Sequence, residues 1–351
     1  MNEITTVGTD LAKSVIVISA ADKSGREIFS RQFNFAGFGE WAANLPPCTF
    51  GMEACSSAHY WARRLTSYGH TVRLIAGEFV NPFRKSRSMK TDRNDAQAVL
   101  AAVLQPDMRF VTPKSIDQQA LLAWHRMRAG YIQDYTALMN RTRGILAEFG
   151  VWLRRSPHAL RQALETLQTD GRLPTPVHGL LAEVKEQLRE LQERVERCNV
   201  EISAHAQRSD DAQRVSALSG IGPITASAAI ATISKASDFK SGRQMAAWIG
   251  LVPSQHSSGG QVRLGPITKR GDTYLRRLLV QGACSAMRAA QCKAPEKRSR
   301  VERWMIELAQ RAGYRKALVG IANKHARIIW AILAKGEAYD PQAWQRHARA
   351  A

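Results

Sequence analysis

Four acidic residues stand where side chains from distant parts of a chain can meet. Asp10 ends a predicted strand in VGTDLAKS, and Glu53 ends another in FGMEAC. Asp92 and Asp95 open a predicted helix in KTDRNDAQAVL, and their spacing of three places both on one helix face. Mg²⁺ prefers oxygen ligands, and two such ions can activate the attacking oxygen and stabilise the leaving oxygen at phosphorus. The four residues therefore point to metal-assisted phosphodiester chemistry.

The charge of the chain supports a nucleic-acid substrate. Fifty lysines and arginines oppose 30 aspartates and glutamates, the formal net charge is +20, and basic residues recur along most of the chain. Nucleic acid fits this charge better than a membrane surface, because no strongly amphipathic basic helix stands alone. Carboxylates that face a polyanion repel it unless divalent cations lie between them.

A simpler interpretation exists for each acidic residue. Asp92 and Asp95 could cap a helix and stabilise its dipole. Asp10 could be a turn residue, and Glu53 could be an exposed charge. Residue types, the positive charge and an RNase H-like order of predicted strands leave the two interpretations balanced.

Other features exclude several classes of protein. The five cysteines are odd in number and show no CxxC spacing, which is typical of reduced cytosolic thiols and not of a disulfide framework or a zinc site. No basic segment followed by an apolar one opens the sequence, so we do not expect secretion. The longest apolar runs, such as VIVISAA and SAAIATI, are too short to span a bilayer. We expect a cytoplasmic protein without a membrane partner.

Residues 1–112 alternate strand and helix patterns, which predicts an α/β domain. β-branched residues are dense over residues 4–20 and predict two strands around a turn. Residues 56–69 show a helical pattern with Gly69 as its stop.

Residues 113–208 are predicted to form a helical connector with a coiled coil over about residues 178–205. Apolar residues recur there at alternating spacings of three and four, which is typical of a coiled-coil seam. The seam favours a helix pair between two chains and hence a dimer; the alternative is one amphipathic helix packed on its own domain. The seam consists of Leu181, Val184, Leu188, Leu191, Val195, Cys198 and Ile202.

Residues 209–340 form a predicted C-terminal, mainly helical domain, followed by a tail at 341–351. The segment ALSGIGPITASAAIATI looks like a helix-hairpin-helix element with Gly220 and Gly222 in its turn. Such a turn can point backbone N–H groups at a phosphate, and an ordinary interhelical turn is the alternative. A loop rich in Pro, Ser and Gly follows, and then a helix that carries adjacent arginines.

The motifs, taken in their order, resemble a known family. GTDLAK, GMEAC and KTDRNDA precede GIGPITA, GLVPSQHSSGG, and finally ITKRGD with LRRLL. This set resembles the insertion-sequence transposases with a DEDD tetrad, a family that includes Piv-type invertases and bridge-RNA-guided recombinases. Each motif alone is weak, whereas the ordered set is specific and runs from residue 5 to about residue 335. The resemblance implies an N-terminal RuvC-like (RNase H-like) domain, a coiled coil and a C-terminal transposase domain.

The resemblance also implies roles for individual residues. Asp10, Glu53, Asp92 and Asp95 match the family's metal-binding tetrad, for which Mg²⁺ is the expected ion and Mn²⁺ an acceptable one. The family's second catalytic element is a serine that attacks DNA and forms a covalent phosphoserine link.

We assign the nucleophile to Ser258, because it immediately precedes Gly259 as the family's serine does, and Ser257 is the alternative. A serine hydroxyl needs a base, a metal or a strong positive potential to attack. His256 is not expected to share the side of Ser258 on an extended loop, so we favour activation by Mg²⁺. The residues expected to stabilise the phosphate charge are Arg263, Lys269 and Arg270.

The partners implied by the resemblance are donor and target DNA and a structured noncoding RNA that pairs with both. Arginines interleaved with Trp124 and Tyr131 suit structured RNA, where stacking and phosphate contacts dominate; a solvated helix face is the alternative for any one of them. The predicted nucleic-acid contacts are Arg84, Lys85, Arg87, Lys90, Arg93, Arg126, Arg128, Arg141, Arg143, Arg263, Lys269, Arg270, Arg276 and Arg277.

A tetramer is also implied, in which the tetrad of one chain works with the serine of another, in a prokaryotic cytoplasm and at the nucleoid when active. Two other functions remain open. One is a metal-dependent junction-resolving nuclease that uses the tetrad alone. The other is a non-catalytic nucleic-acid-binding protein.

Overall fold

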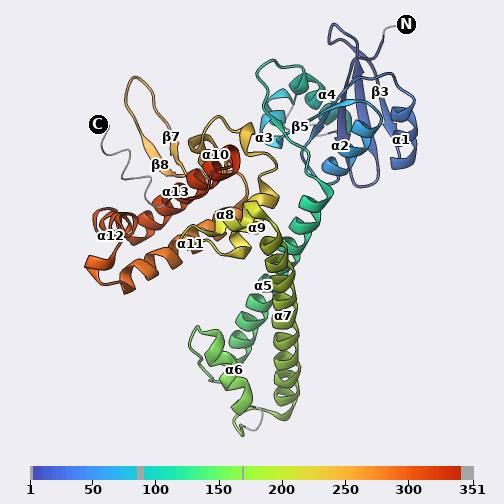
Figure 1. Ribbon diagram of the computed structural model, residues 1–351. Helices are drawn as coiled ribbons and strands as arrows, with labels where there is room; N and C mark the ends of the chain where they lie inside the picture. Colours follow the sequence, from blue (N-terminus) through green and yellow to red (C-terminus); the bar gives the residue numbers. More distant parts are fainter. Residues whose placement is uncertain (1–2, 85–90, 168–169, 341–351) are drawn as a thin grey trace. The chain divides into compact units, whose positions relative to one another are not determined.

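The computed structural model describes residues 3–84, 91–167 and 170–340. The chain divides between Ser115 and Ile116 into two compact units (Figure 1). This division falls close to the end of the predicted α/β domain at residue 112. The described part of the second unit holds both the helical segment and the C-terminal segment that the sequence suggested as separate domains.

The first unit is built on a six-stranded mixed sheet. Its strands lie in the order β3-β2-β1-β4-β5-β6. β2 runs antiparallel to both β3 and β1, whereas β1, β4 and β5 are parallel to one another, and β6 is antiparallel to β5. The strands are β1 (Thr6–Leu11), β2 (Ile16–Ala21), β3 (Glu27–Phe33), β4 (Thr49–Glu53), β5 (Thr71–Ile75) and β6 (Phe110–Val111). The expected mixed α/β fold is confirmed, and it is consistent with an RNase H-like domain.

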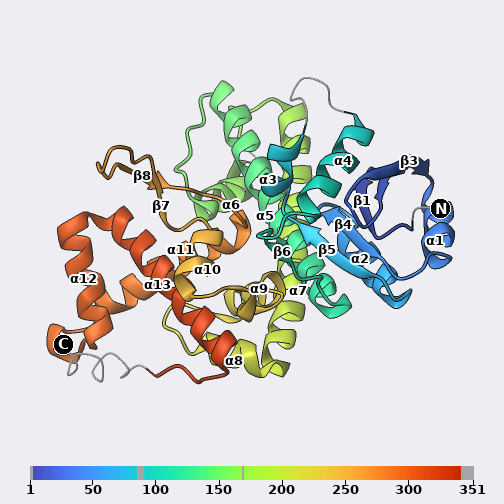
Figure 2. The ribbon, with the colours of Figure 1, turned by 90° about the horizontal axis from the view of Figure 1, so that it is seen from above.

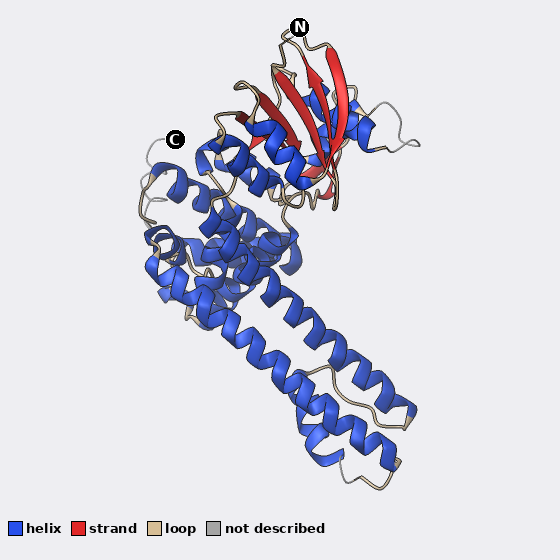
Figure 3. Cartoon of the chain, turned by 90° about the vertical axis from the view of Figure 1, so that its right-hand side faces the viewer, coloured by secondary structure: helices blue, strands red, loops and turns tan. Residues whose placement is uncertain are grey.

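Helices cover this sheet, which is drawn in red in Figure 3. Val7 of β1 belongs to a core shared with Phe38 of α1 and Trp61 of α2. Gly8, the next residue, instead meets α4. Because side chains alternate along a strand, α1 and α2 lie against one face and α4 against the other. The helices are α1 (Phe35–Ala43), α2 (Ala58–Ser67), α3 (Gly77–Val80), the short η1 (Asn81–Phe83) and α4 (Asp92–Val103).

Two paired glycines allow α4 to approach the sheet closely. Gly8 of β1 lies opposite Gly51 of β4. A Cβ on Gly8 would lie 2.4 Å from the carbonyl oxygen of Ala96 and from the amide nitrogen of Leu100. A Cβ on Gly51 would lie 2.9 Å from the Cβ of Val103. Any side chain at these positions would therefore push the helix away from the strands.

The second unit contains two long helices that run side by side, α5 (Ile116–Glu148) and α7 (Thr175–Arg208) (Figure 3). The short helix α6 (Pro157–Thr166) lies between them in the chain and joins the same apolar core. The remaining elements are α8 (Asp210–Ser216), α9 (Pro223–Thr232), η3 (Ala236–Asp238), α10 (Gly242–Trp248), β7 (Pro253–Gln255), β8 (Leu264–Ile267), α11 (Thr273–Cys292), η4 (Pro295–Lys297), α12 (Arg300–Ala312) and α13 (Tyr314–Lys335).

The predicted coiled-coil seam is covered by α5 of the same chain. Leu181, Val184 and Leu188 of α7 share a core with Leu138 and Leu146 of α5. Further along, Cys198 and Ile202 pack with Leu121 and Leu122. The helix pair that the spacing predicted between chains is thus formed within one chain, as the alternative interpretation held. Assembly of several chains stays a prediction.

The largest core of the second unit is formed by the buried residues of the helices from α8 through α13. Helices α8 and α9 with their turn give the helix–turn–helix expected from ALSGIGPITASAAIATI. Within the described residues, α13 alone has the length and apolar composition of a membrane span. Ile321, Ile329 and Ile332 of α13 are buried in this core, so α13 is an interior helix of the unit.

A buried histidine ties three helices of the second unit together. His125 of α5 is 1% exposed, and its Nδ1 lies 3.0 Å from the hydroxyl of Tyr274 on α11. Its Nε2 lies 3.1 Å from Oγ of Ser227 on α9. Burial, and then the charges of Arg128 and His205, lower the pKa of His125 to about 4. The imidazole is therefore neutral at physiological pH.

This histidine predicts how stability changes with pH. The unfolded chain binds a proton at this residue near pH 6.5, whereas the folded chain binds it only near pH 4. The free energy of unfolding should be greatest above pH 6.5 and fall by up to about 3 kcal/mol as the pH decreases towards 4. Denaturant titrations at pH 7.5 and 4.5 give the change in the free energy of unfolding with pH for the wild type and for His125→Gln. The difference between these two changes is the contribution of His125. Equal pH dependences would contradict it.

Candidate active site

Asp10 and Glu53 stand at the same level on neighbouring parallel strands. β1 and β4 pair with Gly8 opposite Gly51, and Asp10 and Glu53 each come two residues later. Side chains two apart on a strand share a face, and paired strands lie about 4.8 Å apart. Both carboxylates therefore point to the side of the sheet that carries α4.

Helix α4 brings the other two carboxylates to that side. Oγ1 of Thr91 accepts a hydrogen bond of 3.2 Å from the Asn94 amide, and this cap starts the helix. Asp92 and Asp95 both lie in its first turn. Asp95 is only 5% exposed, whereas Asp92 is exposed.

An arginine joins two of these carboxylates. Nε of Arg84 lies 2.8 Å from Oδ1 of Asp95, and its Nη2 lies 3.5 Å from Oε2 of Glu53. Nη1 of Arg84 donates a hydrogen bond of 2.7 Å to Oδ1 of Asn81 in η1. Glu53 and Asp95, 42 positions apart in the sequence, thus share one guanidinium. The sequence predicted Arg84 as a nucleic-acid contact, and the structure instead pairs it with the acidic residues.

The chemistry of these donors fits a hard divalent cation. All four side chains offer carboxylate oxygens, and a cation, the guanidinium of Arg84, already lies between two of them. In the conformation described, no three histidine, cysteine or acidic side chains of residues 3–84, 91–167 and 170–340 gather closely enough to hold a metal ion. Glu53 and Asp95 are held together by the guanidinium of Arg84 instead.

Cys55 is a neighbour of the acidic residues that the sequence did not single out. It follows Glu53 by two residues at the end of β4. Desolvation, and then the negative charges of Glu53 and Asp10, raise the pKa of its thiol. The effect of both charges on one sulfur is a further sign that Asp10 and Glu53 lie close together. The position of Cys55 two residues after Glu53 in GMEAC was the sequence signal that could have indicated this proximity.

The predicted serine loop is a β-hairpin of the second unit. Strands β7 and β8 pair antiparallel, and Figures 1 and 2 show the hairpin extending away from the helices of its unit. At the tip, the amide of Gln261 donates a hydrogen bond of 3.0 Å to the carbonyl of Ser258. Gly259 and Gly260 between them have φ of +57° and +76°. Two positive φ angles in a two-residue loop give a type I′ turn, which favours glycine at both positions.

The two adjacent serines have different environments. The hydroxyl of Ser257 accepts a hydrogen bond of 3.2 Å from the Arg263 amide and one of 2.9 Å from Nε2 of Gln255. Ser258 is exposed beside the turn, and its hydroxyl makes no hydrogen bond among the described residues. Ser257 thus helps to hold the hairpin together, whereas the hydroxyl of Ser258 is exposed.

The hairpin also corrects the expectation about His256. The pairs Gln255–Leu264 and Ser258–Gln261 fix one register between them. His256 and Ser258 lie just beyond β7, where the amide of His256 donates to the carbonyl of Arg263 and Ser258 bridges to Gln261. In an extended segment of this register, residues two apart face the same side, so the side chains of His256 and Ser258 are expected to share a face.

Comparison with known proteins identifies the chain. Residues 7–150 match the family model of the DEDD transposases of the IS110 type, and residues 212–302 match that of the Transposase IS116/IS110/IS902 family. The chain is 45% identical to a probable family 20 transposase of Pseudomonas aeruginosa over 95% of its own length and 98% of that protein. It belongs to the IS110 family of transposases. It is therefore an enzyme that cleaves and rejoins DNA.

Two further relatives carry names of insertion sequences. The transposase for insertion sequence element IS1111A of Coxiella burnetii is 36% identical over 97% of this chain and 92% of its own length. The transposase for insertion sequence element IS1328 of Yersinia enterocolitica is 34% identical over 97% of this chain and 99% of its own length. The similarity thus covers both units of the transposase.

One predicted nucleic-acid contact of the transposase is an interior residue. Arg276 of α11 is 9% exposed, and its Nη1 donates hydrogen bonds to the carbonyls of Ile249 at 2.8 Å and Arg270 at 2.6 Å. Its Nη2 donates to Oγ1 of Thr273 at 3.1 Å. The guanidinium therefore joins both ends of the segment that carries the hairpin. The neighbouring Arg277 is exposed and lies over the ring of Tyr274.

The other predicted basic residues fall into three groups. Arg128 donates to Asn199 of α7 and Arg143 to the carbonyl of Ser156, so both support the helical segment. Lys85, Arg87 and Lys90 lie outside the described residues. The exposed ones are Arg93, Arg126, Arg141, Arg263, Lys269, Arg270 and Arg277.

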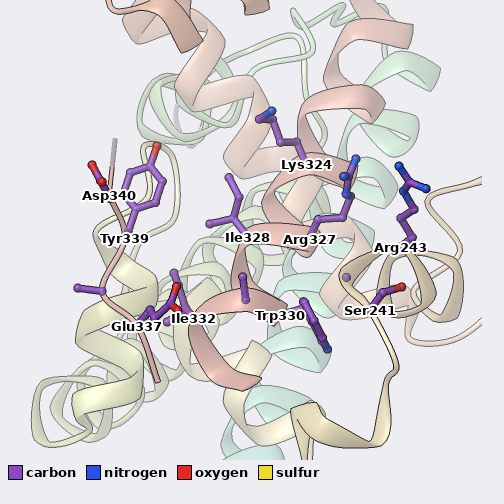
Figure 4. A pocket seen from close by; sticks show the side chains of 13 residues that line it. Ser241, Arg243, Lys324, Arg327, Ile328, Trp330, Ile332, Glu337, Tyr339 and Asp340 are labelled. Atoms are coloured by element: carbon purple, nitrogen blue, oxygen red, sulfur yellow. The ribbon is translucent and has the colours of Figure 1, made fainter. Parts of the chain in front are cut away.

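A pocket of about 590 Å³ lies elsewhere in the second unit (Figure 4). Lys324 and Arg327 of α13 and Arg243 of α10 line it, and none of the predicted site residues is among its lining. Burial, and then the charge of Arg327, lower the pKa of Lys324 to about 8. Glu337 and Asp340 line the pocket as well, so it combines both signs of charge.

The interior position of Arg276 can be tested by substitution. Arg276→Lys keeps the charge but leaves at least one of the carbonyls of Ile249 and Arg270 without a donor. We expect the free energy of unfolding of the second unit to fall by about 2 kcal/mol. Arg277→Lys, the exposed neighbour, should change it by less than about 0.5 kcal/mol. Denaturant unfolding of both variants measures this, and equal effects would contradict the structural role of Arg276.

Proposed function

We propose that this transposase exchanges DNA strands through a covalent link between Ser258 and DNA, with the carboxylates of Asp10, Glu53, Asp92 and Asp95 holding divalent metal. The observation that carries the proposal is the exposed hydroxyl of Ser258 beside a type I′ turn, next to a serine whose own hydroxyl is engaged in the hairpin. The all-carboxylate composition of the acidic site supports the metal part.

The chemistry balances without an external energy source. Oγ of Ser258 attacks the phosphorus of a phosphodiester, and one ester oxygen leaves and takes a proton as a hydroxyl. A hydroxyl of another strand then attacks the phosphoserine, which restores a diester and releases the serine. Divalent metal at the carboxylates would supply positive charge for the attacking and leaving oxygens.

Other residues of the hairpin suit this step. His256, two residues from Ser258 in the extended register of the hairpin, is the residue that we propose accepts the serine proton. Arg263, opposite His256 in the hairpin register, is exposed and can offer its guanidinium to the phosphate. Because the serine and the carboxylates belong to different units, we propose that a complete site combines both, with the serine of one chain serving the carboxylates of another in a tetramer.

The guide in this proposal is a structured noncoding RNA, and base pairing to donor and target DNA selects the sequence. The support is the exposed side chains of α5, which include Arg126, Arg141 and the 42% exposed indole of Trp124. Guanidinium and indole groups bind structured RNA through its phosphates and unpaired bases.

The covalent step is tested by substitution of the serines. With Mg²⁺ and DNA that carries the element ends, the wild type and Ser257→Ala should give a protein–DNA adduct on a denaturing gel. Ser258→Ala should form none and should be slower in strand exchange by at least about a thousandfold. Asp95→Asn should lose cleavage as well.

The two remaining functions give different results in the same assay. Cleavage that persists in Ser258→Ala without an adduct would indicate a junction-resolving nuclease. Full activity of Asp95→Asn would contradict the metal role of the carboxylates.

The RNA contact has its own test. We expect Arg126→Gln combined with Arg141→Gln to weaken binding of the RNA transcribed from the element end and to lower the salt dependence of log K by about two phosphate contacts. Arg189→Gln and Arg194→Gln on α7, where both arginines pair with glutamates of their own helix, are the control. Filter binding at salt concentrations from about 50 to about 300 mM measures the RNA affinity and its salt dependence for the test and control variants. Equal slopes would exclude this face of α5 as the RNA contact.

A further inference from the structure

Arg84 lies between two carboxylates of the proposed metal site. We infer that its guanidinium is a built-in cation that occupies this site in the metal-free enzyme and must leave before a divalent ion binds. The inference rests on the proposed function, because it concerns the same carboxylates. The new element is that Arg84 competes with the divalent ion for these carboxylates.

The first step is the electrostatic need that Arg84 meets. The side chain of Asp95 is 7% exposed, and that of Glu53 is 29% exposed. A largely buried carboxylate is costly unless a positive charge compensates it. Arg84 lies 2.8 Å from Asp95 and 3.5 Å from Glu53 and supplies that charge.

The second step is that the compensation is mainly ionic. Nε of Arg84 is buried, yet it makes no hydrogen bond within the described residues, because its N–H is not aligned with Asp95. The contact to Glu53 is long for a directed bond. The hydrogen bond that fixes the guanidinium runs to Asn81 instead. A divalent cation with twice the charge can therefore replace Arg84 at these oxygens.

The third step is that Arg84 and a metal exclude each other. Gly77 confines the Glu53 carboxylate from another side, since a Cβ there would lie 2.4 Å from Oε1. Glu53 is also fixed at the end of β4, and Asp95 at the first turn of α4. These carboxylates therefore have limited room to turn, and the two cations are expected to compete for the same oxygens.

The fourth step concerns how Arg84 can leave. A guanidinium keeps its proton at any physiological pH, so the site cannot be released by deprotonation. The side chain has to move, and a DNA phosphate is the natural new partner for it. Metal binding and DNA binding should therefore support each other, because each favours the displaced position of Arg84.

The test measures metal binding to the full-length enzyme directly. Titration with Mn²⁺, followed by electron paramagnetic resonance of the free ion, gives the Kd. We expect Arg84→Gln to bind Mn²⁺ at least about tenfold more tightly than the wild type, since a competing charge is removed. Added DNA should tighten Mn²⁺ binding to the wild type and have a smaller effect on Arg84→Gln.

Arg93→Gln is the matched control. It removes the same charge from a residue beside Asp92, but Arg93 is 66% exposed and its partner at 3.8 Å is Glu27, not a carboxylate of the site. Its Kd for Mn²⁺ should change by less than about twofold, as expected for an exposed charge.

The outcomes separate this inference from the proposed function. If Arg84→Gln binds Mn²⁺ no more tightly than the wild type, while Asp95→Asn abolishes binding, the carboxylates hold metal and the competing role of Arg84 is wrong. If Asp95→Asn leaves Mn²⁺ binding unchanged, the metal role of the carboxylates itself fails.

Discussion

The acidic site depends on how closely α4 packs against the sheet. Gly8 and Gly51 are paired across β1 and β4, and their missing side chains let the helix backbone rest almost on the strands. The catalytic candidates Asp10 and Glu53 come two residues later on the same strands and face the same helix. A side chain at either glycine would push α4 outwards and with it Asp95, whose ion pair with Arg84 depends on the position of the helix. A steric constraint in the core thus sets the electrostatics at the surface.

The second unit positions its candidate nucleophile in a comparable way. The exposed hairpin tip with Ser258 is a small, self-supporting structure, because Ser257 and the Gly-Gly turn supply its internal bonds. The buried guanidinium of Arg276 binds both ends of the segment that carries the hairpin. Arg276 belongs to α11, which is joined to α5 and α9 through Tyr274 and His125. The candidate nucleophile is presented to solvent, whereas the groups that support the hairpin are buried.

The sequence predicted what depends on local pattern. The strand ends at Asp10 and Glu53 and the helix start at Asp92 follow from the period of apolar residues and from turn chemistry. The α7 seam shows the limit of the same signal, because a period shows that a face is buried but not which helix covers it. Here α5 of the same chain covers it.

Charge in a sequence also says nothing about burial. Arg84 and Arg276 were both predicted as nucleic-acid contacts, and the structure pairs one with carboxylates and the other with backbone carbonyls. His256 was set aside because the loop was not recognised as a hairpin, in which residues two apart share a face. These assignments needed the tertiary structure.

Cys55 carries a consequence for the choice of ion. A thiol two residues from Glu53 could recruit a soft metal to the acidic site, but only as a thiolate. Desolvation and the neighbouring carboxylates raise the pKa of this thiol, so forming the thiolate costs more here than at a solvated cysteine. The same negative charges that attract a hard cation thus make Cys55 a less favourable ligand for a soft one such as zinc.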